Sequence, residues 1–302
     1  MLIQSPFDYV LQYVFRCNET SKTTMAAVKG NVIHKMFNNA VLNAGEDWNK
    51  IKEALVTNFD MSFEAAVNDV GIELLSPKNR LTYNLFKDVV KTYSIPAFVR
   101  IVEENKLIVV GSEVDIIVGF DKIGQFNAKI DMVLKNQQGR YVIMDLKWTD
   151  GRDKKREEEI RNNTEMQLAL YAEAVRRHFG NGDESCVDAI GYFMLRQGVF
   201  ITEYHGLKDS KDVRIVEKTD TDSIFEMVKN SYEFRMSQLK GEEGTSVIEE
   251  GEQMKVTGLG VKGYHDEGGR FPLKGISLKA KGYTGEKCTT WGKNVVLKGM
   301  LK

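Results

Sequence analysis

The stretch FNAKIDMVLKNQQGRYVIMDLKW, residues 126–148, decides the fold of this chain. Two runs rich in Val, Ile, Leu and Met flank the turn signal NQQG at 136–139, and this pattern is typical of paired antiparallel strands. Asp145 and Lys147 are two residues apart, so on a strand both side chains point to one face. Asp131 lies on the neighbouring strand. A register that aligns the two strands would bring both carboxylates near one point.

Two carboxylates at one point repel each other, and the repulsion raises one pKa unless a cation lies between them. A divalent metal is the simple solution, since few oxygen ligands with open water positions suit Mg²⁺ or Mn²⁺. Lys147 would then orient or activate the attacking water and steady the charge that builds on a phosphate. The pattern points to metal-assisted phosphodiester hydrolysis. By itself, however, D-x-K is short, and a surface ion pair on an edge strand is its commoner explanation.

Apolar periodicity predicts the elements around this hairpin. Helices are expected at 6–17, 25–43, 48–59, 76–94, 164–180 and 223–241, one or two strands at 106–120, and a second hairpin at 188–205. Pro77 and Pro96 should punctuate the helical pieces, and the charge run at 151–163 should be a solvated loop or helix start. On the helix at 164–180, Met166, Leu170 and Ala174 form one apolar stripe, and Leu168 and Val175 form another, so we expect packing on two sides. The order predicts a mixed α+β sheet flanked by helices, with a helical N-terminal addition.

Composition excludes several classes of protein. The 302 residues include 42 Lys and Arg and 43 Asp and Glu, for a net charge of −1, and 42% are hydrophobic, which excludes disordered, collagen-like and coiled-coil chains. No apolar run reaches the roughly 18 residues of a membrane span, and MLIQSPFDYV does not look like a secretory signal. Cys17, Cys186 and Cys288 are too few for a disulfide scaffold, so we expect a reducing compartment, the cytoplasm.

Further polar side chains could join the acidic pair. Gly30 and His34 are four apart on an expected helix, where the glycine would leave room beside the imidazole. Gln167 and Tyr171 have the same spacing, which puts both polar tips on one helix face, and Glu113 could supply a third carboxylate. Each is weak alone, because a single His, Glu or half-buried Tyr more often serves packing or the surface.

Taken in order, these pieces resemble the RecB-type nuclease family of the PD-(D/E)XK superfamily. The order is G-x-x-x-H, then E, then I-D, then D-x-K, then Q-x-x-x-Y, carried by Gly30–His34, Glu113, Ile130–Asp131, Asp145–Lys147 and Gln167–Tyr171. The resemblance spans residues 5–205. It implies an α/β fold with a restriction-endonuclease-like core.

The resemblance also implies a role for each matched position. Asp131 and Asp145 would hold the metal, Mg²⁺ or Mn²⁺, with His34 and the backbone carbonyl of Leu146 completing the ligands. Lys147 would position the attacking water.

Three other matched positions would support these groups. Gln167 and Tyr171 would line the site and contact DNA or support the catalytic residues. Glu113 resembles the acidic residue that precedes the Asp motif in this family. One departure is Ala128, which stands where family members usually carry a glycine before the first Asp.

Iron–sulfur chemistry is not expected here. Relatives such as the AddB nuclease module and the CRISPR-associated RecB-like exonucleases hold an iron–sulfur cluster, which needs four thiolates. With three cysteines the chain cannot supply them. This argues against a CRISPR-adaptation role and against a typical AddB subunit.

The function implied is metal-dependent hydrolysis of DNA in repair, recombination or defence. By analogy with RecB-like relatives, which often process DNA ends, we expect an exonuclease. DNA would be the main partner, and a helicase or recombination protein is a second candidate partner. We expect no binding to a membrane. The alternative is a nuclease-fold module that only binds DNA or acts with a separate helicase. The presence of Asp131, Asp145 and Lys147 together favours the enzyme.

Three parts of the chain are expected. Residues 1–105 would be a helical part that carries the His motif, residues 106–240 the nuclease core, and residues 241–302 a Gly/Lys-rich extension without an assigned role. Lys154, Lys155 and Arg156 follow the D-x-K strand and are either a solvated face or contacts to backbone phosphate. Trp148 should pack in the core rather than stack on a base.

Overall fold

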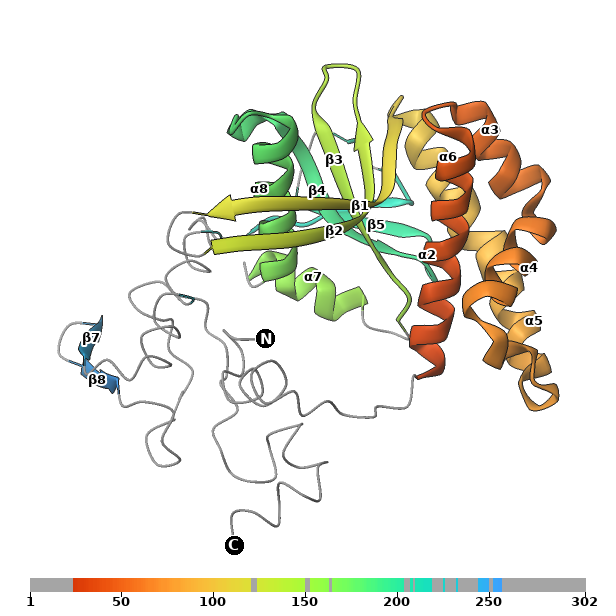
Figure 1. Cartoon of the computed structure of the whole chain (residues 1–302), viewed down its shortest axis with the longest axis horizontal. Coiled ribbons are helices and arrows are strands. Elements are labelled where there is room, and N and C mark those ends of the chain that lie inside the picture. Colours follow the sequence, from red (N-terminus) through yellow and green to blue (C-terminus); the bar gives the residue numbers. More distant parts are fainter. Residues whose placement is uncertain are drawn as a thin grey trace, which may run out of the picture. The chain divides into compact units, whose positions relative to one another are not determined.

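In the computed structural model, a mixed β-sheet and the helices around it form the larger unit of the chain (Figure 1). The described residues are 24–120, 124–149, 153–162, 165–203, 207–208 and 210–218, positions 225 and 232, and two strands at 244–249 and 252–256. The expected helix at 6–17 lies outside the described residues. So do most residues of the expected helix at 223–241 and of the extension at 241–302. Strands β7 (Gly244–Glu249) and β8 (Glu252–Val256) form an antiparallel pair of their own.

The larger unit is built on a six-stranded mixed sheet with the order β1-β2-β3-β4-β5-β6. The strands are β1 (Ile108–Phe120), β2 (Gly124–Lys135), β3 (Tyr141–Lys147), β4 (Val187–Met194), β5 (Val199–Thr202) and β6 (Val213–Ile215). Neighbours β1/β2, β2/β3 and β4/β5 run antiparallel, whereas β3/β4 and β5/β6 run parallel. Both predicted hairpins, and the mixed sheet as a whole, are therefore confirmed.

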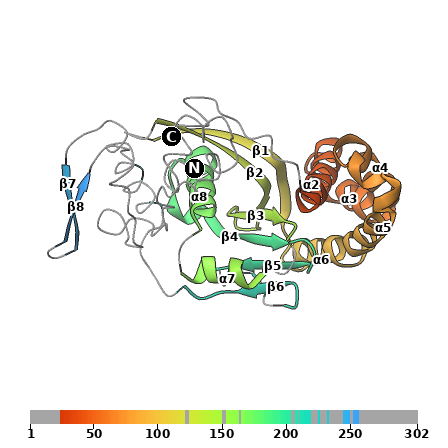
Figure 2. The same cartoon turned by 90° about the horizontal axis from the view of Figure 1, so that it is seen from below.

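Helices cover both faces of the sheet (Figure 2). One side carries α2 (Met25–Ala44), α3 (Trp48–Lys52), α4 (Phe59–Val70), α5 (Arg80–Val89) and α6 (Ile95–Glu104), with π-turns at Glu53–Thr57 and Val90–Ser94 and 3-10 turns at Ile72–Leu75 and Pro77–Asn79. The other side carries α7 (Asp153–Arg161) and α8 (Met166–Phe179), and a 3-10 turn at Glu184–Cys186 precedes β4. This is the expected α/β architecture with an N-terminal helical region.

Alternation along the strands explains how the two faces differ. Met132, Met144 and Leu146 point to the side of α2–α6 and belong to one shared apolar cluster with those helices. The intervening residues, Asp131 and Asp145 among them, face the other side. Burial of the first set holds the hairpin in a register that fixes where the carboxylates emerge.

Two local expectations need correction, and one open alternative is decided. The helix expected to stop before Pro96 continues through it, because a π-turn at Val90–Ser94 leads into α6 and Pro96 lies in the first turn, where no N–H is needed. Of the two alternatives for the charge run, a solvated loop or a helix start, the structure has the helix, α7, anchored by buried Ile160. On α8, Leu168, Ala174 and Val175 of the two predicted stripes are buried. Leu170 is only half-buried, whereas its neighbour Tyr171 is buried.

No helix in the part of the chain that the structure describes is both long and apolar enough to cross a membrane.

Candidate active site

Helix α2 delivers His34 to the sheet. Thr24 caps its first turn by accepting a hydrogen bond from the Ala27 amide at 3.2 Å, and Val32 and Met36 anchor the helix in the core. His34 is half-buried, on a face turned toward β1 and β3. Gly30 makes no close approach, since a Cβ there would meet only the Cβ of Trp148, at 3.8 Å. The room expected beside the imidazole is therefore not required.

Strand β1 brings Glu113 next to Asp131. Ser112 pairs with Met132 and Val114 with Ile130, so Glu113 comes to the level of Asp131 on β2. Glu113 has a φ of 53°, the left-handed region that costs a non-glycine residue roughly 1 kcal/mol or more. The strained residue carries a carboxylate of the candidate site, which is where such strain is commonly retained.

His34 bridges three elements. Its Nδ1 lies 3.0 Å from Glu113 Oε1 and 3.4 Å from Asp131 Oδ1, and its Nε2 donates to the carbonyl oxygen of Leu146 at 3.0 Å. Burial opposes a charge on the ring, but the hydrogen bond to Glu113 and the attraction of Asp131 outweigh it and raise the pKa of His34. The same hydrogen bond from His34, with help from Lys129, lowers the pKa of Glu113 to about 2. These contacts tie His34 to both carboxylates and to the end of β3.

The two aspartates are buried on neighbouring strands. Burial, reinforced by repulsion from Asp145, raises the pKa of Asp131 to about 6, while Asp131 Oδ2 accepts from the Leu146 amide at 2.7 Å. Burial also raises the pKa of Asp145. Both shifts express the cost of holding two charges away from water, which a bound cation would offset.

Asp145 is held by Lys147 and by α8. Lys147 Nζ lies 2.6 Å from Asp145 Oδ2. Gln167 Nε2 donates to Asp145 Oδ1 at 2.9 Å and to the Tyr171 hydroxyl oxygen at 2.8 Å. Burial raises the pKa of Tyr171 to about 12, so its hydroxyl stays protonated. The D-x-K and Q-x-x-x-Y motifs therefore meet at one carboxylate.

The donor atoms suit a divalent metal. His34, Glu113 and Asp131 each offer a ligand atom, all within 4.8 Å of one another. The buried Asp145 Oδ2 has the Lys147 ammonium as its partner, at 2.6 Å. A set of carboxylate oxygens beside one imidazole fits a hard divalent cation. The tightest group thus contains Glu113, whereas the set expected from sequence had Asp145 and the Leu146 carbonyl beside His34 and Asp131.

Sequence reasoning missed two nearby residues. The Lys129 ammonium pairs with Glu113 Oε2. Because Lys129 lies two residues before Asp131 on one strand, the sequence could have indicated that both side chains share a face of the sheet. Tyr192 on β4 lies opposite Asp145 in the parallel register, and the Arg156 guanidinium lies 4.8 Å above its ring. Arg156 faces this interior and pairs with Glu159 at 2.5 Å, rather than standing on a solvated face.

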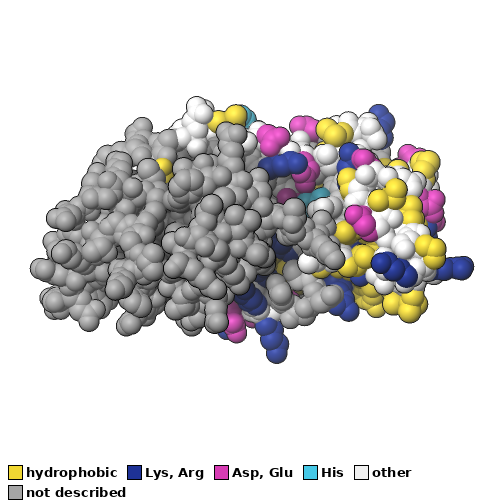
Figure 3. Space-filling view, turned by 60° about the horizontal axis from the view of Figure 1, so that its bottom comes forward, with side chains coloured by type: hydrophobic (Ala, Val, Ile, Leu, Met, Phe, Trp, Pro, Cys, Tyr) yellow, Lys and Arg dark blue, Asp and Glu magenta, His cyan; other side chains and the backbone are white. Residues whose placement is uncertain are grey.

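The basic, acidic and histidine side chains of this region lie next to one another in the space-filling view (Figure 3). Trp148 is turned away from them, 8% exposed and edge-to-face with Phe86 at 4.8 Å, which confirms its expected place in the core. Cys186 is a free thiol, and Cys17 and Cys288 lie outside the described residues.

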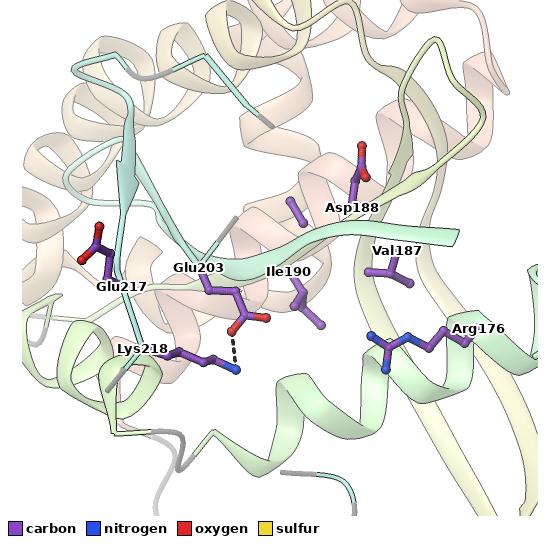
Figure 4. A pocket seen from close by; sticks show the side chains of 8 residues that line it. Arg176, Val187, Asp188, Ile190, Glu203, Glu217 and Lys218 are labelled. Carbon is purple, nitrogen blue, oxygen red and sulfur yellow. Dashed lines mark ion pairs between the residues drawn. The ribbon is translucent and has the colours of Figure 1, made fainter. Parts of the chain in front are cut away.

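A cavity of about 580 Å³ lies elsewhere (Figure 4). It is lined by Arg176, Val187, Asp188, Ala189, Ile190, Glu203, Glu217 and Lys218. None of the motif residues lines it, so it is separate from the candidate active site. Lys218 pairs there with Glu203, and its Nζ lies 3.4 Å from Oε1 of the buried Glu165.

Glu165→Gln should change how stability depends on pH. Burial raises the pKa of Glu165 to about 7 from its ordinary 4.5, so the folded protein binds this proton more tightly than the unfolded chain and loses stability as pH rises through that window. Between pH 5 and pH 8, we expect the wild type to lose about 1–3 kcal/mol more unfolding free energy than the variant, by urea titration. Exposed Glu217→Gln is the control, and an equal pH dependence in wild type and Glu165→Gln would contradict the assignment.

Comparison with known proteins adds one finding. The model of one protein family, described as the PD-(D/E)XK nuclease superfamily, matches residues 2–244. No curated protein matches the chain. The matched range contains every element that contributes to the site around His34 and Asp145.

Proposed function

This chain belongs to the PD-(D/E)XK nuclease superfamily, and we propose that it is a RecB-type, Mg²⁺- or Mn²⁺-dependent exonuclease that acts on DNA. Membership itself points to phosphodiester hydrolysis with DNA as the substrate. The observation that carries the finer proposal is the convergence of five sequence motifs, in their family order, on one cluster of side chains. Contacts link α2, β1, β2, β3 and α8 there through His34, Asp131 and Asp145.

The metal would be held by His34, Glu113, Asp131 and Asp145, with the Leu146 carbonyl as a further oxygen. When bound, a divalent cation supplies Lewis acidity toward the phosphodiester and lowers the pKa of a water molecule. The carboxylates contribute the negative charge that attracts it, and their burial keeps competing water away.

Lys147 would position the nucleophile. Its ammonium has three donors, and Asp145 Oδ2 at 2.6 Å occupies one of them. The others are available to orient an attacking water and to stabilise charge that develops on the phosphoryl oxygens. Gln167 fixes the second oxygen of Asp145 and Tyr171 fixes Gln167, so α8 acts as a support for the acid–lysine pair.

In the cell we propose a role in DNA repair, recombination or defence, with a helicase as the candidate partner. The residue boundaries of the three expected parts, at 105 and 240, and the cytoplasmic location stay predictions from the sequence. Five motif positions with intact chemistry support an active enzyme over a module that only binds DNA.

Cleavage assays test the proposal. Linear single-stranded, linear duplex and circular DNA would be incubated with the protein in EDTA, Mg²⁺ or Mn²⁺. We expect metal-dependent loss of linear DNA and no loss of circles, because an exonuclease needs an end. Cleaved circles would contradict exonuclease action. No cleavage in either metal would contradict the nuclease assignment, and metal-independent DNA binding without cleavage would favour the binding module.

A further inference from the structure

Lys129 occupies an unusual place at the candidate metal site. It lies on β2 two residues before Asp131, so both side chains rise from the same face of the strand. Its ammonium contacts Glu113 Oε2, while the other oxygen of the same carboxylate is 3.0 Å from His34 Nδ1. Each oxygen of Glu113 therefore has a side-chain nitrogen of the protein itself as its partner.

The two partners differ in how easily they can leave. His34 is anchored on its far side by the Leu146 carbonyl, at 3.0 Å. Lys129 is 60% exposed, whereas Glu113 is 17% exposed, and a flexible four-carbon stem carries its ammonium. A divalent cation held by His34 Nδ1 and Glu113 would lie close to the ammonium on Oε2 and repel it, and Lys129 is the partner that can swing into solvent.

We propose that Lys129 is an exchangeable cation: it holds the Glu113 oxygen in the metal-free protein, gives it up when the metal binds, and then contacts a phosphodiester of the substrate. The inference rests on the proposed function for its last step only. The charge balance supports it. Glu113, Asp131 and Asp145 need cations when no metal is present, and once a divalent cation is bound, an extra ammonium is repelled by it but attracted to an incoming anion.

Metal binding without DNA tests the first step. Mn²⁺ titrations by calorimetry would compare wild type, Lys129→Met and Lys129→Arg. We expect Lys129→Met to bind Mn²⁺ about fivefold more tightly, because no ammonium has to be displaced, and Lys129→Arg to stay within about twofold of wild type. An unchanged or weaker Mn²⁺ affinity of Lys129→Met would overturn the proposal.

Lys135→Met is the matched control for charge. Lys135 lies on the same strand, six residues on and therefore roughly 20 Å away, with its ammonium 5.3 Å from the Tyr141 ring. The Lys135→Met substitution removes the same single positive charge but does not remove a contact to Glu113. Equal tightening in Lys135→Met would show that net charge, not the Lys129–Glu113 contact, sets the affinity, and would also overturn the proposal.

Steady-state cleavage at saturating Mn²⁺ tests the second step. For Lys129→Met we expect KM for DNA to rise about fivefold, kcat to stay within about twofold, and the slope of log KM against log salt to fall by about one, since one phosphate contact is lost. An unchanged KM and salt slope would overturn the substrate contact. If wild type cleaves no DNA, the proposed function fails while the Mn²⁺ comparison still decides the exchange. If wild type cleaves and Lys129→Met binds Mn²⁺ no more tightly, the exchange fails alone.

Discussion

Asp145→Asn is expected to lower the rate of DNA cleavage by at least roughly 10³-fold, the scale of removing a preorganised electrostatic group from an active site. The substitution keeps the shape of the side chain but removes the charge that would bind the metal and hold Lys147. The Asp145 side chain is fully buried, and burial raises its pKa, so its ionised form destabilises the metal-free fold. We therefore also expect Asp145→Asn to be more stable in EDTA at pH 8, by about 1–2 kcal/mol.

Asp188→Asn is the matched control. Asp188 is a buried carboxylate on the adjacent strand β4, where Arg140 Nε lies 2.9 Å from it and Asn136 donates to it. The control should keep wild-type cleavage and lose stability, because its charge is paired. Asp145→Asn should therefore lose cleavage and gain stability, whereas Asp188→Asn should keep cleavage and lose stability. Cleavage rates and urea unfolding at pH 8 measure both, and wild-type cleavage by Asp145→Asn would refute the nuclease mechanism.

The β2–β3 hairpin could be predicted from sequence because its determinants are local. The NQQG turn is closed by a hydrogen bond from the Asn136 amide to the Arg140 carbonyl, at 2.8 Å, which pairs Lys135 with Tyr141. Counting outward from that pair brings Asp131 opposite Asp145. Alternating burial of Met132 and Met144 reinforces this register. The acidic pair of the site thus follows from turn length and strand periodicity alone.

The contacts of His34 and Glu113 could not be derived from spacing. These residues are 79 apart, and their meeting depends on how α2 packs on the sheet. The level of Glu113 also depends on a register shift between Val109 and Gly111 and on a positive φ, neither of which leaves a signal in sequence. Only the resemblance of the ordered motifs indicated that these two residues belong to one site.

Side-chain partners and helix continuity were hard to predict for a different reason. For Arg156 the sequence left solvent and phosphate open, whereas the structure has Glu159 and the Tyr192 ring as its partners, and the second depends on how α7 packs on β4. Pro96 is read correctly only if the preceding π-turn is known. The partner of a side chain and the end of a helix depend on small free-energy differences between alternative conformations, and tertiary packing determines which conformation forms.

Lys147→Met should lower kcat by roughly 10²–10³-fold with a change in KM below about threefold. The proposed role of the ammonium is to orient the attacking water and to stabilise charge that appears only as the phosphodiester reacts. A group that acts in the transition state and not in ground-state binding changes kcat and leaves KM nearly unchanged. Initial rates over a range of DNA concentrations, at saturating Mn²⁺, separate the two parameters.

Two comparisons make this prediction specific to the position of the ammonium. Lys147→Arg keeps the charge, but a planar guanidinium cannot present donors as Lys147 Nζ does from 2.6 Å beside Asp145, so we expect it to recover less than about tenfold of the loss. Lys35→Met removes another partly buried lysine, paired with Asp69 at 2.8 Å outside the site, and should keep the wild-type kcat. Mn²⁺ must still bind to Lys147→Met, because Lys147 is not a ligand. A fall in kcat that is fully restored by Arg, or that is matched by Lys35→Met, would show that charge alone suffices and that Lys147 does not position the water.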